Sequence, residues 1–270
     1  MSLKGENVLI TGASMGIGAA IAKRLAQEQA NLILFARSGD KLKNLSKEVR
    51  DEVGTSIQIL TTVVDVREYS QLDAAVKNVV ETVGPIDVLI NNAGLALGAP
   101  AAFPDLNIED IITMTSTNIN GMMFATYTVL NAGKMKERKR GTILNITSVT
   151  GLEVPPFPGE AVYHSSKAAQ EAFTNVLRTE LQDTNIKVLA LRPGVVDTHF
   201  HQQRVGYDEK MNEDFMSGYE PLVSEDIADA AVFMLSQKER VSVKAMDIVP
   251  TAQRSLQVFD RGWKERNGHQ

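Results

Sequence analysis

The sequence lacks cysteine and any long apolar run. Without cysteine there are no disulfides, thiol nucleophiles or cysteine-bound metals, and the chain suits a reducing compartment, so we expect a cytoplasmic protein. No stretch approaches the roughly 20 apolar residues that span a bilayer, and we expect no signal core in residues 1–7. A membrane partner is therefore not expected.

Positive charge is outnumbered by negative charge. With 28 Lys and Arg against 33 Asp and Glu, the net charge is −5, which argues against a nucleic-acid partner. A basic run at residues 134–140 is interpreted as a helix end, where cations complement the helix dipole. His199 and His201 could mimic metal ligands, but no His-Glu-x-x-His helix accompanies them, so no metal site is predicted. Ser165-Ser166 has no Gly-x-Ser-x-Gly context, which argues against a hydrolase.

Short β-branched apolar runs alternate with longer amphipathic runs along the chain. Strands are predicted at residues 8–10, 32–35, 57–64, 88–90, 142–146, 186–191 and 245–249. Helices are predicted at residues 17–29, 41–53, 71–83, 108–139 (as two helices), 161–183 and 224–236, the last with Ser224 as N-cap. Residues 199–221 are predicted to be an irregular substrate loop, and residues 251–270 a C-terminal tail.

This alternation determines the expected fold class. Strands that are apolar throughout are buried on both faces, and helices between them form right-handed crossovers in a parallel sheet. No linker-like composition divides the chain. We therefore predict an α/β fold: one domain spanning residues 1–270, with a doubly wound parallel sheet (Rossmann fold) of about seven strands.

A glycine-rich turn joins the first predicted strand to the first predicted helix. It reads Thr11-Gly12-Ala13-Ser14-Met15-Gly16-Ile17-Gly18. Glycines allow a tight turn and let a pyrophosphate approach the helix N-terminus, where free N–H groups favour anions. The Gly-x3-Gly-x-Gly spacing departs from the common dinucleotide fingerprint, and no Gly-Lys-Ser/Thr follows as in a Walker loop. Its position after an N-terminal strand favours a dinucleotide site over a plain turn.

The end of the second predicted strand bears on the choice of cofactor. Sites specific for NAD place an acidic side chain there to bind the ribose 2′-hydroxyl. This chain has Ala36 followed by Arg37, and a guanidinium suits a 2′-phosphate by charge and geometry. NADP is therefore favoured over NAD, with a merely solvated Arg37 as the alternative.

Tyr163 and Lys167 lie four residues apart in a predicted helix, and so on one helix face. A phenol normally loses its proton near pH ~10, and a fixed cation beside it lowers that pKa. A tyrosine with a lowered pKa can act as a general acid and base. Such pairs also occur by chance on helix surfaces, so the neighbouring motifs must decide whether this pair is catalytic.

Taken together, the motifs resemble those of the short-chain dehydrogenase/reductase family over residues 7–249. The glycine turn, Asp65-Val66, Asn91-Asn92-Ala93-Gly94, Asn118, Ser148, Tyr163-x3-Lys167 and the segment 193–198 follow in the family's order. Each motif alone is weak, but their common order is specific. One departure is the segment 149–162, which is longer than is usual for the family and is expected to shape the substrate pocket.

The resemblance implies four catalytic residues. Tyr163 would exchange a proton with the substrate oxygen, Ser148 would hydrogen-bond that oxygen, and Lys167 would lower the Tyr163 pKa. Asn118 would hold a water in a proton relay to Lys167. The expected NADP(H)-binding residues are Gly12, Ser14, Met15, Gly16, Ile17, Gly18, Arg37, Ser38, Asp65, Val66, Asn92, Ala93, Gly94, Tyr163, Lys167, Pro193, Gly194, Val196 and Thr198.

Residues 199–208 and 251–253 are similar to those of NADP-dependent 3-hydroxy acid (serine-type) dehydrogenases in the family, which have an arginine at the position of Arg204. Arg204 could bind a substrate carboxylate, or it could be a surface residue on a lid. We predict an NADP(H)-dependent oxidoreductase that interconverts a small secondary alcohol and a ketone or aldehyde, with small hydroxy acids or β-hydroxy carbonyl compounds favoured.

Other functions are open from the sequence. A broad-specificity carbonyl reductase is the nearest alternative, and an epimerase or dehydratase could use the same fold. A dinucleotide-binding regulator without catalysis is a further one, because the fold alone does not establish activity. The family resemblance also implies a homo-oligomer, a tetramer or dimer, formed through the helical regions 108–139 and 161–183.

Overall fold

The computed structural model describes residues 2–155 and 158–268. Pro156 and Phe157, in the segment expected to shape the substrate pocket, lie outside the described residues. Seven parallel strands form one sheet in the order β3-β2-β1-β4-β5-β6-β7. The strands are β1 (Asn7–Thr11), β2 (Asn31–Ala36), β3 (Ile59–Val63), β4 (Val88–Asn91), β5 (Arg140–Ile146), β6 (Asn185–Pro193) and β7 (Ala245–Ile248).

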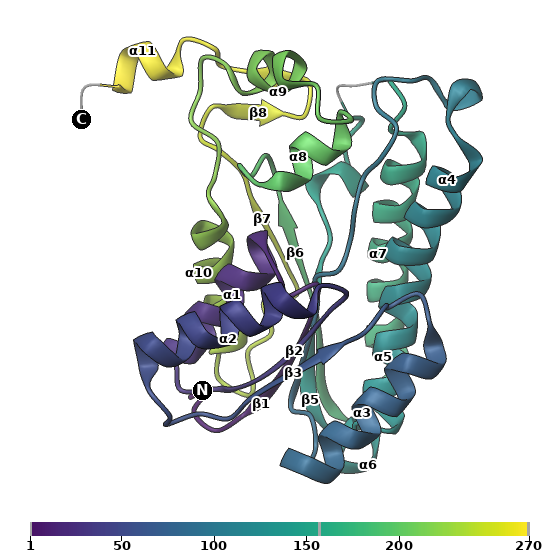
Figure 1. Cartoon of the computed structure of the whole chain (residues 1–270), viewed down its shortest axis with the longest axis vertical. Helices are drawn as coiled ribbons and strands as arrows, with labels where there is room; N and C mark the ends of the chain where they lie inside the picture. The colour runs from purple at the N-terminus through teal and green to yellow at the C-terminus, as the bar shows by residue number, and fades with distance from the viewer. Residues whose placement is uncertain (1, 156–157, 269–270) are drawn as a thin grey trace.

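Helices cover both faces of this sheet (Figure 1). One face carries α1 (Gly16–Gln27), α2 (Gly39–Val53) and α10 (Ser224–Leu235). The other face carries α3 (Tyr69–Val83), α4 (Ile108–Thr115), α5 (Met122–Asn131) and α7 (Ala161–Glu180), and the short α6 (Met135–Arg138) follows α5. The predicted doubly wound α/β fold is thus confirmed. Among the described helices, none is long and apolar enough to cross a membrane.

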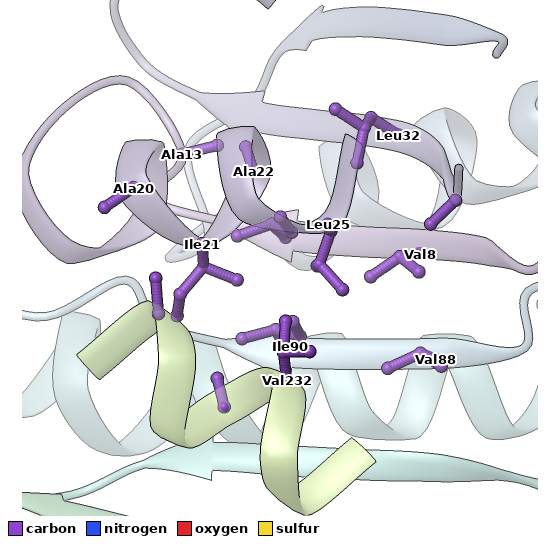
Figure 2. Packing of buried hydrophobic residues seen from close by; sticks show 14 of the residues in the cluster. Val8, Ala13, Ala20, Ile21, Ala22, Leu25, Leu32, Val88, Ile90 and Val232 are labelled. Carbon is purple, nitrogen blue, oxygen red and sulfur yellow. The ribbon is translucent and has the colours of Figure 1, made fainter. Parts of the chain in front are cut away.

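The apolar strands explain why both faces are covered. Successive side chains of a strand point to opposite faces, so Val8 of β1 belongs to one core cluster and Leu9 to the other. Figure 2 shows the first cluster, in which Ile21 of α1 and Val232 of α10 lie against Ile90 of β4. Fully burying one such side chain contributes about 1.5–3 kcal/mol, so both helix layers are needed to bury the sheet.

The region 108–139 differs from the two helices predicted there. A six-residue π-helical segment, Ser116–Gly121, separates α4 from α5, and a further turn at Lys134 precedes α6. Lys134 has a left-handed backbone conformation (φ 63°), which ends the helical path. Single-turn π segments occur often at functional sites, and this one contains Asn118.

The segment 199–221 was wrongly expected to be irregular. It contains α8 (His199–Arg204) and α9 (Glu209–Met216). Asp208 begins α9 by accepting a hydrogen bond from the Met211 amide at 2.9 Å, a local capping interaction. The prediction of Ser224 as N-cap was also wrong by one residue. The N-cap is Val223, whose backbone amide donates a hydrogen bond to the Asp226 carboxylate at 2.9 Å.

The C-terminal tail packs beside this segment rather than trailing away from it. It forms β8 (Gln253–Ser255), β9 (Val258–Phe259) and α11 (Trp263–Asn267), and β8 lies beside α9 in Figure 1. Arg261 donates hydrogen bonds of 2.6 Å to the carbonyls of Phe215 and Ser217. The tail therefore supports α9 beyond the carboxyl ends of the strands.

Candidate active site

A cavity of about 610 Å³ opens at the carboxyl ends of the parallel strands. Its lining includes residues that follow or end six of the strands, from β1 to β6. The sheet order reverses between β1 and β4, and such a reversal leaves a crevice between neighbouring crossovers. The position of the cavity thus follows from the sheet topology rather than from any particular side chain.

The glycine turn packs directly against the end of β4. Gly12 has φ +66°, and a Cβ there would lie 2.8 Å from the Ala93 Cα. A Cβ on Gly18 would overlap the Asn92 amide and the Gly12 carbonyl. The Asn92 side-chain amide donates hydrogen bonds to the backbone carbonyls of Thr11 and Gly12 at 3.1 and 3.0 Å. Glycine is required here because two backbones approach closely, and the result is an open turn at the start of α1.

Helix α1 starts at this turn without a side-chain cap from the described residues. Its first N–H groups therefore remain donors, and the helix dipole adds positive potential there. Ser14, Met15, Gly16 and Ile17 line the cavity at this point. This end of the cavity suits an anionic group such as a pyrophosphate.

Cationic side chains stand at the end of β2. Arg37 and Ser38, which were predicted to bind the cofactor, line the cavity, and Lys41, which the sequence reasoning did not include, joins them. The Lys41 ammonium lies 3.7 Å from the Met15 sulfur, so it leans toward the glycine turn. At the end of β3, Asp65 accepts a forked hydrogen bond from Arg67, with its shortest contact at 2.6 Å. Arg67 is the main cause of a lowered Asp65 pKa.

Tyr163 occupies the wall of the cavity near the ends of β5 and β6. Its side chain comes from α7 and is only 6% exposed. The Ser148 hydroxyl hydrogen-bonds the phenol, donates to the Pro193 carbonyl at 3.3 Å and accepts from the Thr150 amide at 3.1 Å. These bonds fix the Ser148 oxygen beside the Tyr163 hydroxyl, so both groups could reach one substrate oxygen.

The protonation of Tyr163 differs from the sequence-based expectation. Burial raises its pKa well above the usual range, although Arg204 and the Ser148 hydrogen bond act to lower it, and Glu160 acts to raise it. Lys167 lies 5.8 Å from the ring centroid and is not among these causes. The net direction is thus opposite to the predicted one, because desolvation of the phenolate outweighs the nearby cations. Tyr163 is a protonated phenol at neutral pH.

Lys167 lies behind Tyr163 and is also buried, with 5% exposure. Burial lowers the pKa of Lys167 to about 8, partly opposed by Glu171. The ammonium donates to the Ile146 carbonyl at 3.2 Å and to the Gln170 side-chain oxygen at 3.1 Å. Lys167 therefore loses its proton at a lower pH than an ordinary lysine.

Asn118 lies behind the cavity wall and is fully buried. Its side chain bonds the backbone of Leu95 in both directions, at 2.9 and 2.8 Å, and donates to Ser166 at 3.0 Å. Its own carbonyl accepts a hydrogen bond of 2.6 Å from Gln170. The predicted water-mediated relay through Asn118 stays a prediction, but Gln170 now stands between Asn118 and Lys167.

Arg204 is buried at the substrate side of the cavity, with 5% exposure, and so is not a surface residue. Its guanidinium forms an ion pair with Glu160, which directly precedes α7. His201 lies 3.5 Å from one guanidinium nitrogen, and burial lowers its pKa to about 3, so it is neutral. The Phe215 ring lies 5.9 Å from Arg204. The segment 199–221, predicted to be an irregular substrate loop, thus contributes the buried Arg204 of a charged pair to the site.

Nearly all of the predicted site residues line this cavity. The exceptions are Gly18 and Asn118, which lie behind it and shape it. Sequence reasoning missed Lys41, Glu160 and Gln170. The cavity also contains residues that had not been assigned, among them Thr117, Thr150, Phe200, His201, Phe215 and Leu256. Within the described ranges, no group of three or more acidic or histidine side chains could hold a metal ion.

Comparison with known proteins identifies the family. The model of the short chain dehydrogenase family matches residues 6–208. The chain belongs to this family. It is accordingly an NAD(P)-dependent oxidoreductase, and the predicted family resemblance is confirmed.

Individual relatives cover nearly the whole chain. The NADP-dependent 3-hydroxy acid dehydrogenase of Schizosaccharomyces pombe is 36% identical, over 93% of this chain and 95% of its own. Sulfoacetaldehyde reductase 2 of Chromohalobacter salexigens is 35% identical, over 91% of this chain and 94% of its own. A closed form of serine dehydrogenase complexed with NADP+ is 31% identical over 92% of this chain and 96% of its own, with a TM-score of 0.81.

Proposed function

We propose that this chain, as one catalytic domain spanning residues 1–270, is an NADP(H)-dependent oxidoreductase that interconverts a small secondary alcohol and a ketone or aldehyde. The observation that carries the proposal is a single cavity with two chemically different ends. Arg37 and Lys41 line one end, and Ser148 and Tyr163 line the other. A dinucleotide that bridges the two ends would bring its reactive ring to the proton-transfer groups.

The residues at the nucleotide end fit NADP(H). Gly12 and Gly18 let the turn pack tightly against Asn92 and Ala93, where side chains would collide, and the start of α1 offers amides to a pyrophosphate. Ala36 ends β2 where an NAD site would carry a carboxylate. Arg37 and Lys41 supply two cations for a 2′-phosphate.

The groups at the other end supply the proton chemistry. The cofactor supplies or removes the hydride. In reduction Tyr163, protonated at neutral pH, donates its proton to the carbonyl oxygen, while Ser148 turns its single O–H from the Pro193 carbonyl to the same oxygen. In oxidation the phenolate form of Tyr163 accepts the proton of the alcohol. Lys167 binds cofactor ribose hydroxyls in this proposal, and Val196 and Thr198, which line the cavity, hold the nicotinamide side.

The preferred substrate class is a small hydroxy acid or β-hydroxy carbonyl compound. Arg204 supports an acidic substrate because it lines the same cavity as Tyr163. It is also close enough to that residue to act to lower the Tyr163 pKa. The relatives named for a 3-hydroxy acid, a sulfoacetaldehyde and serine agree with this class. An Arg fork can bind a carboxylate with two parallel hydrogen bonds.

A broad-specificity carbonyl reductase is the second candidate. Glu160 already neutralises Arg204, so a substrate carboxylate would have to share the guanidinium with it. Phe200, whose ring lies 5.5 Å from that of Tyr163, and Leu256 add apolar surface to the lining. Both observations favour a neutral ketone or aldehyde.

We also propose a cytoplasmic homo-oligomer, a tetramer or dimer. Ile112 of α4, Tyr127 of α5 and Val176 of α7 are between 49% and 59% exposed on one helical face of the sheet. Large apolar side chains that are exposed together are typical of an interface. Light scattering should give a multiple of 29.5 kDa, whereas a mass of 29.5 kDa would contradict this.

Consumption of NADPH over a panel of ketones, aldehydes and keto acids tests the proposed function, with NADH in parallel. We expect turnover with NADPH and at least about tenfold less efficient use of NADH, because two cations select the 2′-phosphate. Arg37→Ala and Lys41→Ala should each raise the KM for NADPH and leave that for NADH nearly unchanged. Lys43→Ala, on the same helix but not in the cavity lining, is the matched control. No turnover with either cofactor would refute the enzyme, and equal use of both would refute the role of Arg37 and Lys41.

Variants of the buried ion pair distinguish the two substrate classes. If Arg204 binds a carboxylate, Arg204→Ala should lower kcat/KM for hydroxy acids at least about tenfold more than for neutral substrates. Because the single variant removes one member of a buried ion pair and leaves the other charge in place, the double variant Arg204→Met/Glu160→Gln removes both charges together. Glu160→Gln alone should raise kcat/KM for hydroxy acids, because the Glu160 carboxylate would no longer compete with the substrate carboxylate for Arg204. Equal losses for acidic and neutral substrates in the double variant would favour the broad carbonyl reductase.

A further inference from the structure

Gln170 lies one turn beyond Lys167 on α7, facing the same side of the helix. It is 3% exposed and does not line the cavity, so no substrate or cofactor is expected to touch it. Burying an amide side chain is unfavourable unless its polar atoms are hydrogen-bonded. The partners of this amide therefore show what it does.

Both ends of the Gln170 amide are hydrogen-bonded. The Oε1 atom accepts from the Lys167 ammonium at 3.1 Å, and the Nε2 atom donates to the Asn118 carbonyl at 2.6 Å. An ammonium can only donate and a carbonyl can only accept, so the chemistry of the partners determines the orientation of the amide. Neither a carboxylate nor an apolar side chain of this size could satisfy both partners.

The bridge connects three elements that carry site residues. Lys167 and Gln170 lie on α7, Asn118 lies in the π-helical segment, and Ile146, the other acceptor for Lys167, ends β5. Among the described residues these two acceptors leave one of the three ammonium N–H groups of Lys167 available. Gly94, which lines the cavity, lies close to the ammonium: a Cβ there would be 3.7 Å from the Lys167 nitrogen.

We propose that Gln170 is a positioning residue for Lys167: anchored on the Asn118 carbonyl, its amide oxygen holds the ammonium so that the remaining donor serves the cavity. This inference rests on the proposed role of Lys167 toward the cofactor. An amide does not pass a proton on as a hydroxyl or a water does, so the Gln170 bridge between Lys167 and Asn118 anchors the lysine rather than conducting protons.

The neutrality of Gln170 is part of this arrangement. Charged groups near Lys167 are few: Glu171 on α7 raises its pKa, and Arg192 on β6 and the Thr147 hydroxyl hold the Glu171 carboxylate at 3.1 and 2.5 Å. Tyr163, whose ring centroid lies 5.8 Å from the Lys167 ammonium, is a neutral phenol. Gln170 can thus orient the ammonium without adding a negative charge that would keep Lys167 protonated.

The titration of Lys167 itself tests the proposal. NMR of the full-length protein labelled with 13C at the lysine ε-carbons can follow it, with Lys167→Met to assign the signal. The variants are Gln170→Leu, which has similar size and no polar atoms, and Gln170→Glu, which has similar shape and adds a charge. Thr174→Val is the matched control. Thr174 is buried one turn further along α7, and its hydroxyl donates to the backbone carbonyl of Gln170, not to the Gln170 side chain.

The two variants should shift the Lys167 pKa in opposite directions from its value of about 8. Gln170→Leu removes an acceptor from the charged form and should lower it, by at least about half a unit, whereas Gln170→Glu should raise it by about one unit or more. Thr174→Val should leave it unchanged even if it lowers the melting temperature. Unchanged titration in both variants, or shifts in the same direction, would overturn the proposal.

Turnover and cofactor binding give a second readout. With Gln170→Leu, kcat should fall at least about tenfold and the Kd for NADPH should rise, while Thr174→Val should retain nearly normal values. Gln170→Leu with a displaced Lys167 pKa but normal kcat and Kd would overturn the positioning role. Because the Lys167 titration needs neither cofactor nor substrate, its result stands even if no substrate is turned over, so failure of the oxidoreductase proposal would be recognised separately.

Discussion

Removal of water from Tyr163 and Lys167 is the constraint on which the rest of the site depends. Both side chains come from one face of α7 and are almost fully buried, so the charged form of each is disfavoured. The phenol stays protonated, and the lysine has a pKa of about 8. Three neighbouring polar groups act on these two side chains: Ser148 hydrogen-bonds the phenol, Gln170 hydrogen-bonds the ammonium, and Arg204 partly offsets the desolvation of the phenolate.

The sheet explains why these groups meet. Parallel strands end at one edge, so the residues after β1, β4, β5 and β6 converge although they lie far apart in sequence. The sequence predicted this much because apolar strand runs, the glycine turn and the Tyr163–Lys167 spacing are local patterns. The helical periodicity also placed Tyr163 and Lys167 on one face, as the structure has them.

The parts that were not predicted depend on partners distant in sequence. Gln170 could have been noticed as a polar residue on the Lys167 face, but its partner Asn118 is 52 residues away, and only folding brings the two together. Glu160 and Arg204 are 44 residues apart and form a pair only because α8 folds over the start of α7. Lys167 was expected to set the Tyr163 pKa because spacing reveals a nearby cation, whereas the extent of burial is a tertiary property.

The most direct test of the account is the Tyr163→Phe variant, with NADPH binding and NADPH-dependent reduction of the best substrate measured side by side. Removing one hydroxyl leaves the cavity shape and its nucleotide end intact, so the Kd for NADPH should stay within about twofold. The loss of the proton donor should lower kcat by about 10²–10⁴-fold, and wild-type reduction should not decline until the pH is alkaline. Near-normal kcat in this variant would contradict the assignment of Tyr163 as proton donor.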